Sequence, residues 1–203
     1  MPLLLTVVAL SVHPRRPLTT CVVCTQPALV AGKTVLEVGT GLGIAGICAA
    51  LAGASAVLAT DHEPHSLVFT DQNALENGVD ERMQTARLDW NEPTSDALLK
   101  ERFDVLVAAD VLYEDDTAPE VARLMRELVK PRGTAIFSDG RDRIYLEEHT
   151  KELLRLLQAG GEFEVRSSVE LDVSVAEDGG GEREMRVVVL ERKHVFPNPS
   201  RKG

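Results

Sequence analysis

Cysteine, aromatic residues and clusters of basic residues are all scarce in this chain of 203 residues. Three cysteines cannot build a disulfide framework, and the lone pair Cys21 and Cys24 lacks the second pair that a metal site needs. A net charge of −10 without a sizeable Lys/Arg cluster argues against binding to nucleic acid. No apolar run is long enough to span a membrane. From the charge we expect no nucleic-acid partner, and from the apolar runs no membrane partner.

The first 30 residues have no regular periodicity. An apolar run from Leu3 to Val12 has the length of a signal-peptide core, but Arg15 and Arg16 follow it instead of preceding it. We therefore favour a cytoplasmic location over secretion or an organelle address. The length suits one domain with a full core. We expect an irregular segment at 1–30, packed against the domain or incomplete at its start, a single domain at 31–195 and a disordered tail at 196–203.

The stretch from Thr34 to Gly46 is typical of a buried strand, a glycine turn and the start of a helix. Gly39 and Gly41 allow positive φ and let another molecule touch the backbone. Gly43 and Gly46 open a helix rich in Ala and Ile. Such a turn directs free backbone N–H groups and a helix N-terminus at a ligand. Dinucleotide-binding enzymes use a similar turn, so the glycines alone do not identify the ligand.

Two acids narrow the choice of ligand. Glu37 sits inside the first strand, where a carboxylate is costly unless a ligand amine or neighbouring backbone N–H groups bond to it. Asp61 ends the next apolar run, where it can accept both hydroxyls of a ribose. The pair fits a nucleoside that carries a cation better than a pyrophosphate, which acids would repel.

From Lys33 onward, strands and helices alternate. The expected strands are 34–38, 57–60, 83–88, 103–109, 134–138, 163–171 and 185–191, and the expected helices are 44–52, 64–76, 118–129 and 145–159. Loops are expected at 130–133 and, mobile, at 177–182. The alternation predicts parallel strands with right-handed crossovers, and the last two strands should pair antiparallel. The fold class is therefore α/β: a Rossmann-like, seven-stranded, mostly parallel sheet with helices on both faces and an antiparallel last strand.

Acids lie at or near the carboxyl ends of the first five expected strands, the fifth of which ends in Ser138-Asp139, and this is where ligands bind in such sheets. Asp89 and Trp90 follow the third strand, and the fourth strand ends at Ala109 and leads into Asp110 and Tyr113. Acids scattered at random would not all collect on one edge of the sheet.

These motifs resemble those of a known family. The run from Glu37 to Gly43, followed by Asp61, is similar to motif I and its acidic partner in class I S-adenosylmethionine-dependent methyltransferases. Asp110 and Tyr113, three apart after the fourth strand, resemble the D-x-x-Y motif of the seven-β-strand protein-lysine methyltransferases, and Asp89-Trp90 resembles that family's motif after the third strand.

The resemblance implies S-adenosylmethionine as cofactor and a protein lysine as methyl acceptor. Trp90 would stack on adenine, Asp89 would bond to the exocyclic amine, Asp110 would anchor the acceptor amine, and Tyr113 would wall the acceptor channel. The implied cofactor-binding residues are Glu37, Gly39, Thr40, Gly41, Gly43, Asp61, Asp89, Trp90 and Ala109, and the implied catalytic residues are Asp110 and Tyr113.

Several alternatives stay open. The family usually carries an N-terminal tryptophan segment, which residues 1–32 lack, so the pocket closes differently or the start is incomplete. A methyltransferase acting on a small-molecule amine, a non-catalytic binding module and a dehydrogenase are the competing readings. His62, Glu63 and His65 have poor spacing for a metal site, so we expect no metal. An acidic surface can attract a basic protein substrate, but more often it only keeps a protein in solution. We expect a monomer.

Overall fold

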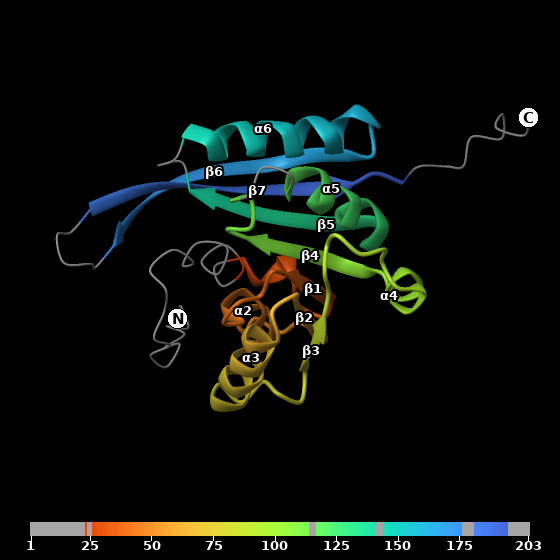
Figure 1. Cartoon of the computed structure of the whole chain (residues 1–203), viewed down its shortest axis with the longest axis vertical. Coiled ribbons are helices and arrows are strands. Elements are labelled where there is room, and N and C mark those ends of the chain that lie inside the picture. The colour runs from red at the N-terminus through yellow and green to blue at the C-terminus, as the bar shows by residue number, and fades with distance from the viewer. Residues whose placement is uncertain (1–22, 24–25, 114–116, 141–143, 176–180, 195–203) are drawn as a thin grey trace, which may run out of the picture.

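The computed structural model describes residues 23, 26–113, 117–140, 144–175 and 181–194, which form one seven-stranded sheet with helices (Figure 1). The strands lie in the order β3-β2-β1-β4-β5-β7-β6. They are β1 (Thr34–Val38), β2 (Ala56–Asp61), β3 (Met83–Arg87), β4 (Phe103–Ala109), β5 (Val129–Gly140), β6 (Phe163–Val175) and β7 (Gly181–Arg192). The expectations for most of 1–30, for Cys21 and Cys24, and for the tail at 196–203 lie outside the described residues.

Helices cover both faces of the sheet. They are η1 (Pro27–Leu29), α2 (Ile44–Leu51), α3 (Pro64–Glu76), α4 (Asp96–Glu101), α5 (Thr117–Leu128) and α6 (Ile144–Ala159). The apolar side chains of α2 belong to one hydrophobic core, and those of α5 and α6 belong to a second core on the opposite face. None of the helices in the described part of the chain is long and apolar enough to cross a lipid bilayer.

The central strands are apolar on both faces because each face is covered. In β4, Val105 and Val107 pack toward α2, whereas Leu106 and Ala108 pack toward α5. All four residues are buried, as is typical of a strand in the middle of a doubly covered parallel sheet. Because parallel strands end at one edge of the sheet, the segments that follow β1, β2, β3 and β4 come together there.

The predicted fold class is confirmed. β1 pairs in parallel with β2 and β4, and β7 pairs antiparallel with both β5 and β6. The last two strands are longer than expected, and β7 already includes Gly181 and Glu182, which were expected in the mobile loop. The remainder of that loop, residues 176–180, lies outside the described residues.

Two local expectations are wrong. Residues 130–133 were expected to form a loop, but they belong to β5, which begins at Val129 because Val129 pairs with Phe103 of β4. An irregular register just after this pair absorbs the turn residues, and Arg132 takes a positive φ of 65°. The short helix α4 was not expected; Ser95 caps it by accepting a hydrogen bond from the Leu98 N–H at 3.4 Å.

Candidate active site

The glycine turn after β1 is held in a left-handed conformation. Gly39 and Gly41 have φ of 67° and 55°, which glycine adopts without steric cost. Helix α3 fixes the turn from the side: the Thr70 hydroxyl donates to the Gly41 carbonyl at 3.2 Å, and the Asn73 amide donates to the Leu42 carbonyl at 2.9 Å. The turn is therefore a rigid part of the edge of the sheet.

Glu37 lies beneath this turn, buried with 2% of its surface exposed. Its Oε2 accepts hydrogen bonds from the Thr40 hydroxyl at 2.6 Å and from the Gly46 N–H at 3.1 Å. A Cβ at Gly46 would lie 2.6 Å from the same oxygen, so only glycine fits there. Of the two kinds of partner that the sequence suggested for Glu37, a ligand amine or backbone N–H groups, the structure shows one backbone N–H, that of Gly46. It adds the Thr40 hydroxyl, which the sequence did not suggest. Gly43 directly precedes α2 as its N-cap.

Asp61 ends β2 with its carboxylate facing the glycine turn. Its Oδ2 accepts from the Gly41 N–H at 2.9 Å, and its Oδ1 accepts from the Glu63 N–H at 3.0 Å. The His62 ring nitrogen Nδ1 lies 3.5 Å from Oδ1. The two acids therefore contact the glycine turn differently. Glu37 is buried and bonds to Thr40 and Gly46, whereas Asp61 bonds to the Gly41 N–H and lines the cavity.

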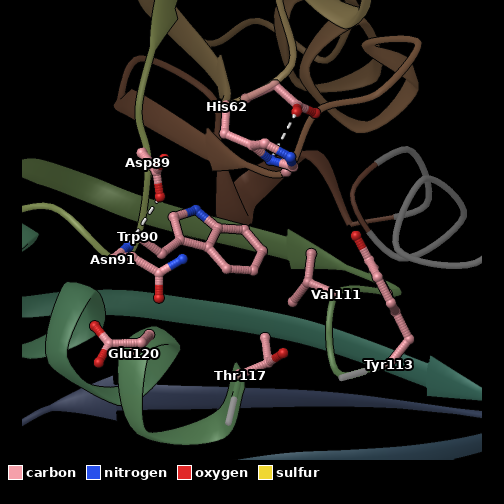
Figure 2. A pocket seen from close by; sticks show the side chains of 10 residues that line it. His62, Asp89, Trp90, Asn91, Val111, Tyr113, Thr117 and Glu120 are labelled. Carbon is pink, nitrogen blue, oxygen red and sulfur yellow. Dashed lines mark hydrogen bonds and ion pairs between the residues drawn. The ribbon is translucent and has the colours of Figure 1, made fainter. Parts of the chain in front are cut away.

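One cavity lies where the central strands end, and the segments that follow these strands line it (Figure 2). It is lined by Gly39, Asp61, His62, Asp89, Trp90, Asn91, Val111, Tyr113, Thr117 and Glu120. Five of the eleven residues that the sequence suggested are therefore in the lining. The other six, which are Glu37, Thr40, Gly41, Gly43, Ala109 and Asp110, lie in the segments that hold these residues in place.

The indole of Trp90 forms one wall of the cavity, between Asp89 and Val111 in Figure 2. It lies close over the glycine turn: a Cβ at Gly39 would come within 3.1 Å of the indole and 2.9 Å of Val111. The indole Nε1–H is buried and has no hydrogen-bond partner within the described part of the chain. A buried donor without a partner is costly, and a ligand in this cavity can supply the missing acceptor.

The segment after β4 reaches the same cavity from the other side. Asp110 has a φ of 53°, a left-handed conformation that aspartate tolerates better than most residues, and its N–H donates to the Ser138 carbonyl of β5 at 3.0 Å. Val111 and Leu112 are buried and hold the segment to the core. Tyr113 is half exposed and lines the cavity.

Sequence reasoning missed the contribution of α5. Thr117 and Glu120, from the first two turns of this helix, line the cavity. Arg123, one turn further on, donates to the Trp90 carbonyl at 2.7 Å. The sequence contains an amphipathic helix here, but it does not indicate which end of the helix meets the cavity.

The strand order, the glycine turn and the acid that ends β2 define the fold of the class I methyltransferases, a class that uses S-adenosylmethionine as methyl donor. More narrowly, the model of the lysine methyltransferase family matches residues 18–159, and this chain belongs to that family.

Two curated relatives and one solved structure illustrate the similarity. The chain is 32% identical over 147 residues to the protein N-lysine methyltransferase METTL21A of Danio rerio, across 71% of this chain and 65% of the relative. It is 37% identical over 121 residues to the ribosomal protein L11 methyltransferase of Heliobacterium modesticaldum, across 58% of this chain and 35% of the relative. The crystal structure of ribosomal protein L11 methylase from Lactobacillus delbrueckii subsp. bulgaricus has a TM-score of 0.62 at 23% identity, covers 87% of this chain and is itself covered to 77%, which shows the shared fold. The chain thus spans about two thirds of the first relative's length and about one third of the second's.

Proposed function

We propose that this chain transfers a methyl group from S-adenosylmethionine to a lysine side chain of a protein substrate. The observation that carries the proposal is that one cavity joins the glycine turn and Asp61 to Tyr113 of the D-x-x-Y segment. A cofactor held by the first group would lie beside an acceptor held by the second. Membership of the lysine methyltransferase family supports lysine as the acceptor.

The cofactor side of the cavity fits S-adenosylmethionine. Asp61 would accept the ribose hydroxyls, the Gly39 turn would leave room for the ligand to approach the backbone, and Asp89 would bond to the adenine amine. The buried Nε1–H of Trp90, which has no acceptor in the described part of the chain, could donate a hydrogen bond to the ligand. Glu37, Thr40, Gly41, Gly43 and Ala109 would contribute by holding these groups in place.

When bound, this cofactor supplies an electrophilic methyl group on a sulfonium. The acceptor nitrogen would attack the methyl carbon with its lone pair as the carbon–sulfur bond breaks, and the sulfur would keep the bonding electrons. The positive charge would pass from the sulfur to the methylated nitrogen, and the resulting ammonium can release a proton to solvent. The protein would contribute mainly by holding the reacting atoms in line.

Asp110 and Tyr113 would bind and orient the acceptor lysine. A free lysine has a pKa of about 10.4, so holding it neutral near pH 7 costs about 4.6 kcal/mol. A carboxylate raises the pKa of a nearby ammonium, so Asp110 would orient the amine and would not deprotonate it. Burial beside a cationic sulfonium would favour loss of the proton. Tyr113 would wall the channel and offer a hydroxyl.

The remaining expectations belong to the same proposal. A net charge of −10 suits a basic protein substrate and gives no phosphate-binding surface, so nucleic acid is not proposed as a partner. A monomeric state and a cytoplasmic location belong to the same proposal.

A transfer assay with methyl-labelled S-adenosylmethionine tests the function. The chain is incubated with extracted cell proteins and, separately, with the small-molecule filtrate of the same cells. We expect label in protein bands and methylated lysine after hydrolysis. Label that appears only in a filterable product would contradict the proposal and favour a metabolite amine as the acceptor.

Asp110→Asn is the sharpest variant for the acceptor site, because asparagine keeps the size and tolerates the positive φ while it removes the charge. We expect transfer to fall by about 100-fold, as for a misplaced reactant, with cofactor affinity within a few-fold of wild type. Asp110→Ala, which removes the whole polar group, should abolish transfer. An equal loss of cofactor binding in Asp110→Asn would place Asp110 in the cofactor site instead.

A further inference from the structure

Arg123 of α5 lies outside the residues that the sequence suggested, yet it has more polar contacts than its neighbours on the helix. Its Nη2 donates to the Trp90 carbonyl at 2.7 Å, and its Nη1 donates to the Thr94 hydroxyl at 2.9 Å. Both acceptors belong to the segment that connects β3 to α4. One guanidinium therefore links the body of the domain to the segment that carries the tryptophan of the cavity.

Two acids of the same helix hold this guanidinium in place. Nε donates to Glu120 at 3.0 Å and Nη1 donates to Glu127 at 2.8 Å, one turn before and one turn after Arg123. Glu127 also accepts from the Thr94 hydroxyl at 2.5 Å. The Arg123 side chain is 30% exposed. A planar guanidinium held by two carboxylates has a fixed direction, so its bond to Trp90 is directional as well.

The position of Trp90 decides the shape of the cavity. The indole lies over Gly39, and its buried Nε1–H has no partner in the described part of the chain. In the described residues, the side-chain hydrogen bonds between this segment and α5 are those that Arg123 donates and the one that Glu127 accepts from Thr94. Without the bond to its carbonyl, Trp90 would keep only apolar packing to hold the ring in place.

We infer that Arg123 is a positioning residue for the cofactor pocket and acts through the backbone of Trp90. This inference rests on the proposed function in one respect, since it takes the cavity beside Trp90 as the place where the cofactor binds. Arg123 is not inferred to touch the cofactor or the acceptor.

Arg126 offers a matched control on the same helix. It is 33% exposed, close to the 30% of Arg123, and it bonds to the carbonyl of Leu156 in α6 and pairs with Glu162. Arg126→Gln therefore removes a comparable tertiary contact of α5, directed at α6 and Glu162 and not at the segment that carries Trp90. Arg123→Gln removes the tertiary contact that we infer to matter.

Because Trp90 is the only tryptophan, its fluorescence reports its surroundings directly. We expect Arg123→Gln to shift the emission to longer wavelength and to increase quenching by acrylamide, while Arg126→Gln leaves both at wild-type values. In calorimetric titrations, the Kd for S-adenosylhomocysteine should rise about tenfold in Arg123→Gln and less than twofold in Arg126→Gln. Arg123→Lys, which keeps one donor, should give intermediate values and replaces the glutamine variant if that variant does not fold.

The outcomes separate cleanly. Equal emission, quenching and Kd in the Arg123 and Arg126 variants would overturn the inference and leave Arg123 with a purely structural role. A wild-type chain that is folded but does not bind S-adenosylhomocysteine would contradict the proposed function. The emission and quenching measurements would still decide whether Arg123 positions Trp90.

Discussion

At the scale of single residues, Glu37 shows how a buried acid can support a ligand site without lining it. A carboxylate inside a strand is costly unless it is hydrogen-bonded, and here Thr40 and Gly46 donate to it from the two ends of the glycine turn. The acid thereby ties the end of β1 to the first turns of α2. The turn keeps its left-handed shape, and Gly41 can present its N–H to Asp61.

Replacement of Glu37 by Ala should destabilise the chain. The change leaves the Thr40 hydroxyl and the Gly46 N–H buried without this acceptor, so the free energy of unfolding should fall by about 1–3 kcal/mol. Urea denaturation measures the change. Glu37→Gln is the control, because its amide oxygen can accept the same bonds, and it should lose clearly less. Equal losses in the two variants would contradict the role given to these hydrogen bonds.

At the scale of elements, the sequence predicted what periodicity and turn chemistry decide locally. The bounds of β1, α3 and β4 agree with the expectation to the residue. A proline begins α3 and an Asn-Gly pair ends it, while apolar, β-branched-rich runs mark the two strands. The six-residue helix α4 is too short to show a helical period. The start of β5 could not be foreseen, because Pro131 and Gly133 indicate a turn and only the pairing of Val129 with Phe103 makes the segment a strand.

One polar cluster joins three strands at the edge opposite the cavity. The Asp104 carboxylate of β4 accepts from the Thr34 N–H of β1 at 2.9 Å and from the Lys130 ammonium of β5 at 2.9 Å. Burial raises the pKa of the Asp104 carboxyl, but the hydrogen bonds from Thr34 and Lys130 together outweigh burial and hold this pKa below its ordinary value. The charged form is therefore favoured in the folded state.

This cluster predicts a pH-dependent contribution to stability. Because the folded pKa of Asp104 is depressed, its contribution is fully present above the unfolded pKa of about 3.9 and is lost as the pH falls through the folded value. Asp104→Asn should lower the free energy of unfolding by about 1 kcal/mol at pH 7, since the pair is partly exposed to solvent. The difference from wild type should stay constant from pH 7 to about pH 5 and shrink below about pH 4.

Denaturation curves at a series of pH values measure this difference. Asp80→Asn, at an exposed position, removes the same charge and serves as the control for net charge. A difference for Asp104→Asn that grows as the pH falls, or that matches the control at every pH, would contradict the assignment.

At the scale of the whole molecule, the topology explains why the candidate site could be located from sequence. The carboxyl ends of parallel strands share one edge, so the glycine turn, Asp61, Trp90 and Tyr113 meet although they are far apart along the chain. The direction of each side chain was harder to foresee, because it depends on the packing around each strand end. Arg123 was missed because its local pairs with acids on α5 look like those of any exposed helix.

The most direct test of the account is a calorimetric titration of S-adenosylhomocysteine into the folded wild-type chain and into Asp61→Ala. We predict one binding site in the wild type and about tenfold weaker binding or worse in Asp61→Ala, the loss expected when a charged hydrogen-bond acceptor is removed. Asp71→Ala, a surface acid of α3 that bonds to Thr85 outside the cavity, should bind like the wild type. A folded wild type that gives no heat, or an Asp61→Ala variant that binds as tightly as the wild type, would contradict the account.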